Sequence, residues 1–331
     1  MNLLPALSVE NLHTHIPTTA GIIKAVNDVS FQIWPGRVLG LVGESGCGKS
    51  ISCLSVLGLL KGTGRVVKGK IRLKDRNILD LPAEEMRKIR GKEISMIMQN
   101  PMSAFDPIVS IGQQFIETIR THKKVTKREA RAIALECLQQ VELPCPEDLL
   151  RRFPFQMSGG MLQRVMIAIA IFSNPAVLIA DEPTTALDVT VQHRILGQLV
   201  KIQEKYNTGI LLVSHDLKVI AQLADEVAVM YCGYIVEKGP AMKIFDHPLH
   251  PYTRALLASR PGLQKLRLKP IGGQPPTLIN LEDRCPFFER CDEASKACLD
   301  YKVKLSKFSQ DHSVSCLKYA SNQEVVLYEL A

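Results

Sequence analysis

The sequence predicts an α/β fold built around a parallel β-sheet, and three features carry this prediction. A glycine-rich segment at residues 43–50 lies between an apolar run suited to a buried strand and a stretch with helix-like apolar spacing. Two later apolar runs, within residues 176–188 and 211–216, each lead into polar residues. In parallel α/β sheets ligands bind at the carboxyl ends of strands, so these polar residues mark a candidate site. The 331 residues, 46% of them hydrophobic, are enough for one large domain or two smaller ones.

The composition favours a soluble cytosolic chain. The start, MNLLPALSVENLHTH, has no cationic segment followed by a long apolar run, so no secretory signal is expected. The longest apolar stretch, VMIAIAIF at residues 165–172, is too short to cross a bilayer. The net charge of +8 is scattered, which predicts a solvated basic surface near anionic lipid headgroups. Nucleic-acid binding has little support, because no aromatic residues are interleaved with the basic ones.

The segment GESGCGKS matches the pattern G-x-x-x-x-G-K-[ST] of a phosphate-binding loop. Glycines let the backbone approach phosphate oxygens, and the N-terminus of the following helix adds partial positive charge. Lys49 supplies a cation to the β- and γ-phosphates, and the Ser50 hydroxyl is expected to ligate Mg²⁺. We expect the whole loop to hold the nucleotide phosphates: Gly43, Glu44, Ser45, Gly46, Cys47, Gly48, Lys49 and Ser50. Cys47 stands at a variable position of the motif, where we expect a small residue that fits.

Two carboxylates follow the apolar run that begins at residue 176. Asp181 is expected to hold Mg²⁺ through water, and Glu182 is expected to polarise the attacking water as a general base. Adjacent side chains of a strand point to opposite faces, so the two roles do not compete. His215, after the last apolar run, is expected to reach the γ-phosphate and report its presence. Together these residues predict an enzyme that hydrolyses a nucleotide.

Six motifs in a fixed order resemble those of the ATP-binding-cassette (ABC) family. QMSGGMLQRV at 156–165 resembles the family's signature, IMQNP supplies the Q-loop glutamine Gln99, and TALD at 185–188 resembles the D-loop. The phosphate loop, the carboxylate pair and the histidine stand in the family's order around them. The resemblance covers about residues 5–245.

The resemblance implies an ABC-type P-loop ATPase domain at residues 1–245. Its RecA-like parallel-sheet core would carry an antiparallel β layer, and its helical subdomain would lie at about residues 100–165. Gln99 would join Ser50 and Asp181 around Mg²⁺ and act in catalysis. Two cassettes would pair head to tail, so that the signature contacts the ATP of the partner through Ser158, Gly159 and Gly160. ATP binding then closes the dimer and hydrolysis reopens it.

Two positions depart from the family pattern. Met161 stands where the signature often has glutamine, and the family's adenine-stacking aromatic has no counterpart near Ile16, where the neighbours are His13 and His15. The residue that stacks on adenine is therefore open.

Within the family, the chain looks like the ATPases of peptide and nickel importers. SAFDP, IADEPTTALDVTVQ and HPLHPYTRALLASRP followed by GGQPP read like that subfamily. The resemblance implies ATP hydrolysis coupled to uptake of dipeptides, oligopeptides or nickel chelates. It implies two transmembrane permease subunits, a second, non-identical ABC ATPase and an extracytoplasmic substrate-binding protein as partners, no nucleic acid, and a peripheral location on the cytoplasmic face of the cell membrane. The alternative is a soluble ABC ATPase that acts on nucleic acid or ribosomes, but this chain has neither the long insertions nor the second cassette of those proteins.

The C-terminal extension, residues 246–331, holds four of the nine cysteines in the spacing C-x5-C-x6-C-x17-C: Cys285, Cys291, Cys298 and Cys316. A reducing compartment disfavours disulfides, structural zinc sites usually have C-x2-C pairs, and the ferredoxin spacing is also absent. The residues alone leave an iron–sulfur cluster, zinc and free thiols open. The resemblance favours the cluster, because peptide-importer ATPases carry a CPF-x-x-RC segment of this kind at which a [4Fe–4S] cluster has been recognised. Arg284 and Arg290 are then expected to offset the negative charge of its thiolates.

Overall fold

The computed structural model describes residues 4–185, 187–259 and 271–320. Contacts divide the chain into two compact units. The first comprises Met1–Gln32, Val38–Leu79 and Ser214–Ala331, and the second comprises Ile33–Arg37 and Asp80–Val213. Both units contain helices and strands, so the predicted α/β class is confirmed.

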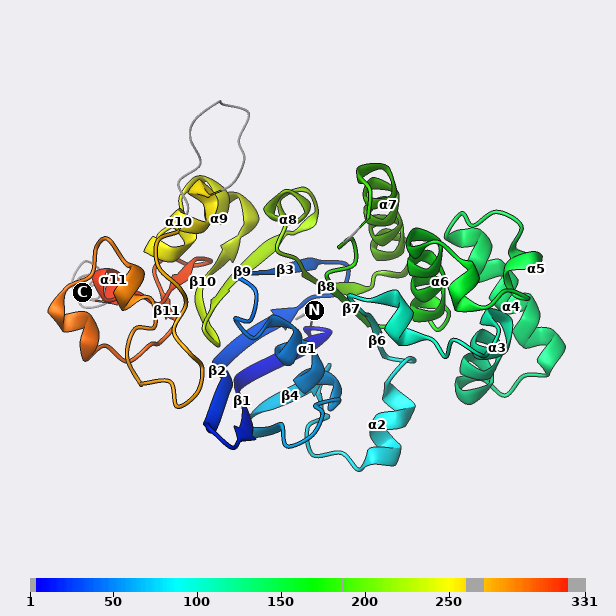
Figure 1. Cartoon of the computed structure of the whole chain (residues 1–331), viewed down its shortest axis with the longest axis horizontal. Coiled ribbons are helices and arrows are strands. Elements are labelled where there is room, and N and C mark those ends of the chain that lie inside the picture. The colour runs from blue at the N-terminus through cyan, green and yellow to red at the C-terminus, as the bar shows by residue number, and fades with distance from the viewer. Residues whose placement is uncertain (1–3, 186, 260–270, 321–331) are drawn as a thin grey trace. The chain divides into compact units, whose positions relative to one another are not determined.

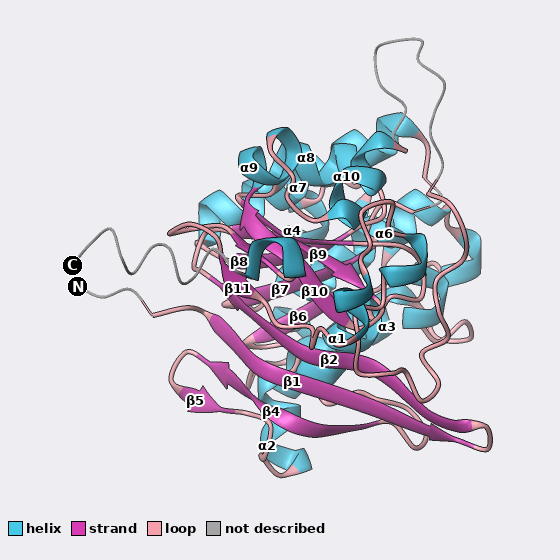
Figure 2. Cartoon of the chain, turned by 90° about the vertical axis from the view of Figure 1, so that its left-hand side faces the viewer, coloured by secondary structure: helices cyan, strands magenta, loops and turns pink. Residues whose placement is uncertain are grey.

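An antiparallel layer of long strands lies in the first unit (Figures 1 and 2). Its order is β2-β1-β4-β5, with bounds β1 (Leu7–Thr18), β2 (Gly21–Ile33), β4 (Arg65–Leu73) and β5 (Arg76–Asn77). Leu7 lies opposite Leu73 and Val9 opposite Ile71, and all four side chains are buried. Such apolar cross-strand pairs stabilise a sheet and fix its register. The antiparallel layer implied by the family resemblance is therefore present.

A second set of strands in the first unit follows the order β11-β12-β10-β9-β3. Its bounds are β3 (Val38–Val42), β9 (Glu226–Tyr231), β10 (Tyr234–Pro240), β11 (Ser306–Lys307) and β12 (Ser313–Val314). β3 pairs in parallel with β9, and the remaining pairs are antiparallel. All five residues of β3 are buried, as expected for a parallel strand covered on both faces. The helices of this unit are α1 (Lys49–Leu57), α8 (Leu217–Leu223), α9 (Ala241–Asp246), α10 (Pro251–Ala258) and α11 (Leu317–Ala320).

The second unit holds three parallel strands in the order β8-β7-β6: β6 (Ile94–Ile97), β7 (Val177–Asp181) and β8 (Gly209–Val213). Every residue of β7 and β8 is buried. Its helices are α2 (Ala83–Ile89), α3 (Ile111–His122), α4 (Lys127–Gln140), α5 (Pro146–Leu149), α6 (Gly159–Ile171) and α7 (Val189–Tyr206). Helices α3, α4 and α5 fall in the range predicted for a helical subdomain.

The C-terminal segment is joined to both strand sets of the first unit. β12 extends the second set beyond β10, where the buried carboxylate of Glu237 lies 2.8 Å from Nε2 of His312. Ile279 forms an isolated antiparallel β-bridge with Ile23 of β2. Short 3-10 turns at Phe288–Arg290 and Lys296–Leu299 complete the segment. Across the described part of the chain, none of the helices has the length and apolar character needed to span a membrane.

Candidate functional site

The phosphate loop connects β3 to α1 in the first unit, and its glycines are required by geometry. Gly43 and Gly48 have φ of 156° and 107°. A Cβ at Gly43 would lie 2.1 Å from the carbonyl oxygen of Met230, and one at Gly48 would lie 2.3 Å from that of Ala25. Any side chain at either position would therefore collide with backbone. The loop packs tightly against the strands behind it and turns its other side outward.

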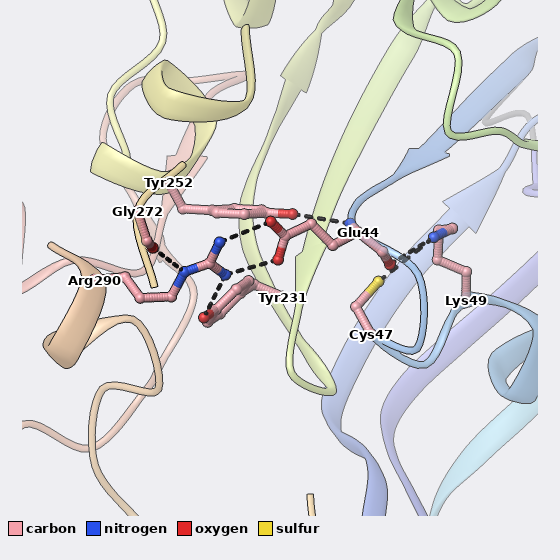
Figure 3. Close-up of polar contacts among 7 residues, drawn as sticks. All are labelled: Glu44, Cys47, Lys49, Tyr231, Tyr252, Gly272 and Arg290. Carbon is pink, nitrogen blue, oxygen red and sulfur yellow. Dashed lines mark hydrogen bonds and ion pairs between the residues drawn. The ribbon is translucent and has the colours of Figure 1, made fainter. Parts of the chain in front are cut away.

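Lys49 is the first residue of α1 and is 6% exposed. Its ammonium donates to the carbonyls of Gly43 at 2.8 Å and Glu44 at 2.9 Å and lies 3.7 Å from Sγ of Cys47 (Figure 3). The loop therefore fixes the cation by its own carbonyls, next to the backbone that is predicted to hold phosphate. Burial raises the pKa of the Cys47 thiol, although the Lys49 ammonium opposes this shift. The group beside the ammonium is therefore a neutral thiol.

Two loop amides have partners inside the protein. The N–H of Glu44 donates to the Tyr252 hydroxyl at 2.9 Å, and the N–H of Cys47 donates to the Glu44 carbonyl at 3.3 Å. The second of these hydrogen bonds closes a tight turn at Glu44. Ser45 and Ser50 are exposed, as is Gly46, so the outer side of the loop is accessible to a ligand.

The predicted carboxylates lie in the second unit at the end of β7. Asp181 is the last residue of the strand and is 5% exposed. Glu182 has φ of 48°, a left-handed conformation uncommon outside glycine, and its N–H donates to the Val213 carbonyl at 2.9 Å. One oxygen of its carboxylate accepts from the Gln99 amide at 2.8 Å and from the Thr185 hydroxyl at 2.9 Å. The structure thus brings Gln99 and Glu182 together and adds Thr185, which the motif analysis did not single out.

The signature residues stand at the start of α6 in the second unit. Ser158 is the N-cap of the helix and accepts from the N–H of Met161 at 3.3 Å. Gly159 and Gly160 form the first turn, and a Cβ at Gly160 would lie 2.8 Å from Cγ1 of Val191 on α7. Ser158 and Gly159 are exposed. The signature therefore presents a helix N-terminus to solvent, while Gly160 permits close packing of two helices.

The residues that the sequence predicts for the nucleotide site are divided between the two units. The phosphate loop and His215, an exposed residue between β8 and α8, belong to the first unit. Gln99, the signature, Asp181 and Glu182 belong to the second.

The four C-terminal cysteines line one cavity of about 370 Å³ in the first unit, with His250, Phe287 and Tyr301 also in its wall. Within the described residues, no group of three or more His, Cys, Asp or Glu side chains is arranged to hold a metal ion. Burial raises the pKa of Cys285 to about 11 and raises those of Cys291 and Cys316, with smaller contributions from neighbouring thiols. The thiols surround a space, and a positively charged occupant would be needed to stabilise their thiolates.

The sequence suggested that Arg290 would offset the charge of the cysteine thiolates. In the structure its guanidinium is paired elsewhere. Its guanidinium makes a bidentate pair with the Glu44 carboxylate at 2.8 and 2.9 Å and donates to the Tyr231 hydroxyl at 3.1 Å (Figure 3). Arg284 also pairs elsewhere, with Glu282 at 2.5 Å and Glu289 at 3.2 Å. Tyr231 and Tyr252 also adjoin the loop, and no sequence pattern predicted them because neither belongs to a nucleotide-binding motif.

Comparison with known proteins finds two family models. One, described as ABC transporter, matches residues 26–185, and another, described as oligopeptide/dipeptide transporter C-terminal region, matches residues 236–298. The dipeptide transport ATP-binding protein DppD of Bacillus subtilis is 44% identical over 94% of this chain and 93% of its own length. The oligopeptide transport ATP-binding protein AppD of the same organism is 43% identical over 95% of this chain and 96% of its own length.

Among solved structures, the dimeric post-hydrolysis state of the ATP-binding cassette MJ0796 with ADP and phosphate covers 71% of this chain and 98% of its own. Its TM-score is 0.64 and its identity 27%. The structure of the cassette cbiO1 of Clostridium perfringens covers 74% of this chain and 92% of its own, with a TM-score of 0.61 and 26% identity.

Proposed function

The chain belongs to the ABC transporter family of ATPases, and we propose that it hydrolyses ATP to drive the uptake of dipeptides or oligopeptides. The observation that carries the peptide assignment is the match of residues 236–298 to the oligopeptide/dipeptide transporter C-terminal region, which extends beyond the cassette. Relatives similar over nearly the whole chain are named for dipeptide and oligopeptide transport. Uptake of nickel chelates stays a prediction from sequence resemblance.

In this proposal, the phosphate loop and Lys49 bind the ATP phosphates. Ser50, Gln99 and Asp181 hold Mg²⁺, which neutralises charge on the phosphates when bound. Glu182 accepts the proton of the attacking water. Support for this role comes from its carboxylate, which the Gln99 amide and the Thr185 hydroxyl hold in one orientation.

Three further residues would act on ATP held by a second cassette: Ser158, Gly159 and Gly160. The exposed helix N-terminus formed by the first two supports this role, because backbone N–H groups and the helix dipole favour an anion there. His215 would contact the γ-phosphate from its exposed position after β8.

The partners follow from the transport proposal. They are two transmembrane permease subunits, a second and non-identical ABC ATPase, and an extracytoplasmic substrate-binding protein. The chain would bind the permeases at the cytoplasmic face of the membrane.

We also propose that the four C-terminal cysteines hold a [4Fe–4S] cluster with a structural or regulatory role. Support comes from the cavity, since all four thiols line one space of about 370 Å³. A cubane cluster is larger than a single ion and suits ligands spread around a cavity better than zinc does. Anaerobic purification tests this directly: a brown protein with iron and sulfide in equal amounts supports the cluster, and a colourless protein with stoichiometric zinc excludes it.

The transport function is tested by uptake in a strain that lacks this chain. Radiolabelled dipeptide and oligopeptide uptake should be lost and should return with the wild-type chain but not with the Glu182→Gln variant. A parallel assay with radioactive nickel separates the two cargo classes. Normal peptide uptake in the deletion strain, or copurification of the tagged chain with ribosomes or DNA in place of permeases, would contradict the proposal.

A further inference from the structure

Every backbone and side-chain polar group of Glu44 has a partner in the first unit. Its N–H donates to Tyr252, its carbonyl accepts from Lys49, and its carboxylate is held by Arg290 (Figure 3). Glu44 follows Gly43, the first residue of the phosphate loop. Three contacts thus hold the backbone and the side chain of Glu44 at the point where the chain enters the loop.

Arg290 reaches this loop from the cysteine segment. Its side chain is 4% exposed, and besides the pair with Glu44 its Nε donates to the Gly272 carbonyl at 2.8 Å. Its guanidinium carbon lies 5.7 Å from the ring centroid of Tyr231 and 5.9 Å from that of Phe287. The bidentate pair raises the pKa of Arg290 further above its usual value, so its charge is permanent. Planar bidentate pairs of this kind fix direction as well as distance.

Two routes join this pair to the cysteine cavity. Arg290 precedes Cys291 directly, and the turn is closed by the N–H of Cys291, which donates to the Phe288 carbonyl at 3.3 Å. Phe287 forms part of the cavity wall and also packs edge-on against Tyr231 and Tyr252, with centroids 5.3 and 5.4 Å apart. Phe287, Tyr231 and Tyr252 are at most 1% exposed. An occupant of the cavity would therefore contact Phe287, which packs against Arg290 and both tyrosines.

We propose that Arg290 is a positioning residue for the phosphate loop, and that through Glu44 the order of the cysteine segment sets the affinity of the loop for nucleotide. The link rests on the proposed function in one respect, namely that the loop binds ATP. It assigns a partner to the second position of the phosphate-loop motif and a task to the arginine beside Cys291. Loss or disorder of the cysteine segment would then weaken ATP binding without change in any residue that touches the phosphates.

A double-mutant cycle on the intact chain tests the link. ATP affinity is measured by calorimetry with Mg²⁺ present for the wild type, Arg290→Gln, Glu44→Gln and the double variant. Each single change should weaken ATP binding at least about fivefold, the lower end of typical coupling between sites, and the double variant should be no weaker than the weaker single variant. Arg290→Lys keeps the positive charge but cannot make the planar bidentate pair with Glu44. Its ATP affinity should therefore resemble that of Arg290→Gln. Thermal unfolding identifies any variant that does not fold. If the Arg290 variants do not fold, the ATP affinity of Glu44→Gln, which leaves the sequence of the extension unchanged, tests the link.

Two matched controls separate the link from general damage. Arg284→Gln removes an arginine of the same segment that is paired with Glu282 and Glu289, and it should leave ATP affinity unchanged. Cys291→Ser should weaken ATP binding in the wild-type background but not in Glu44→Gln. Cys145→Ser, at an exposed position, should have no effect in either background.

The outcomes distinguish the link from the function on which it rests. A wild-type chain that binds no ATP would overturn the proposed function and the link with it. Tight ATP binding by wild type, Arg290→Gln and Glu44→Gln alike would overturn the link alone. So would a double variant weakened by the product of the single effects, or a Cys291→Ser effect that persists in Glu44→Gln.

Discussion

Acidification is expected to loosen helix α10 through one buried histidine. His250 is the N-cap of α10, where its Nδ1 accepts the N–H of Tyr252 at 3.0 Å, and the residue is 2% exposed. Burial lowers the pKa of His250 to about 4, because the imidazolium would lose its hydration; Glu237 opposes this shift and Arg254 adds to it. Only the neutral ring can accept the Tyr252 N–H at Nδ1.

The sign and size of the effect follow from the two pKa values. In the opened segment His250 has a usual pKa of about 6.5, so the opened state binds the proton more readily than the folded state. Stability is therefore complete above about pH 6.5, falls as the pH drops through that value, and stops falling below about pH 4. Between pH 7 and pH 5 the loss is on the order of 2 kcal/mol, which raises the opening constant roughly 20-fold. The pKa of Glu237 is lowered, since hydrogen bonds from His312 and neighbouring groups outweigh its burial, so its carboxylate stays charged in this window.

Hydrogen–deuterium exchange of peptides covering α10 measures this opening. The control variant is His250→Asn, because asparagine is a favoured N-cap that keeps an acceptor and does not titrate. Comparing the two proteins at the same pH cancels the intrinsic exchange rate, and the cost of the smaller side chain is common to both pH values. The ratio of opening constants, wild type over variant, should rise about 20-fold from pH 7 to pH 5. Peptides from α6, which contains no histidine, should show no difference. An unchanged ratio at α10 would show that protonation of His250 does not open the helix.

Three further predictions concern the two groups of site residues. Glu182→Gln should bind ATP with near wild-type affinity and lower turnover in the assembled transporter at least about 100-fold, the usual contribution of a general base; near-normal turnover with the partner cassette inactivated would exclude this role. Lys49→Ala should lose ATP affinity at this chain's site in equilibrium binding, and retained affinity would contradict the phosphate-loop assignment. Gly160→Ala should lower stability by about 1–3 kcal/mol in thermal unfolding because its Cβ meets Val191, with recovery in the double variant with Val191→Ala. Gly197→Ala on α7 has open space around it and should not destabilise the chain, which provides the matched control.

The phosphate loop was recognisable from the sequence because its residues follow one another in a short motif. Lys49 is placed by the start of α1, whereas the collisions that require glycine at 43 and 48 come from the carbonyls of Met230 and Ala25, which are distant in sequence. A strand, a tight turn and a helix follow one another within a few residues, so a short motif contains most of the information. The continuous apolar runs that predicted buried strands at β7 and β8 are also local features of the sequence.

The partners of Glu182 required more than spacing. Gln99 lies 83 positions away in sequence, and the hydrogen bond between them depends on the parallel pairing of β6 with β7. Family resemblance supplied Gln99 because the family preserves the order of its motifs. Thr185 was within a recognised motif, but its hydroxyl was not singled out, because the left-handed turn at Glu182 that brings it near cannot be read from residue types.

The pair between Glu44 and Arg290 shows where motif reasoning ends. The two residues are 246 positions apart, and Glu44 occupies a position that the phosphate-loop motif leaves variable. A variable position is free of the local constraint, so its side chain is available for contacts made by the rest of the fold. Sequence proximity assigned Arg290 to the neighbouring cysteines, whereas the 3-10 turn before Cys291 directs the guanidinium to the loop. The extension and the loop are therefore best understood as one structural element, and the residues that join them are the ones to vary first.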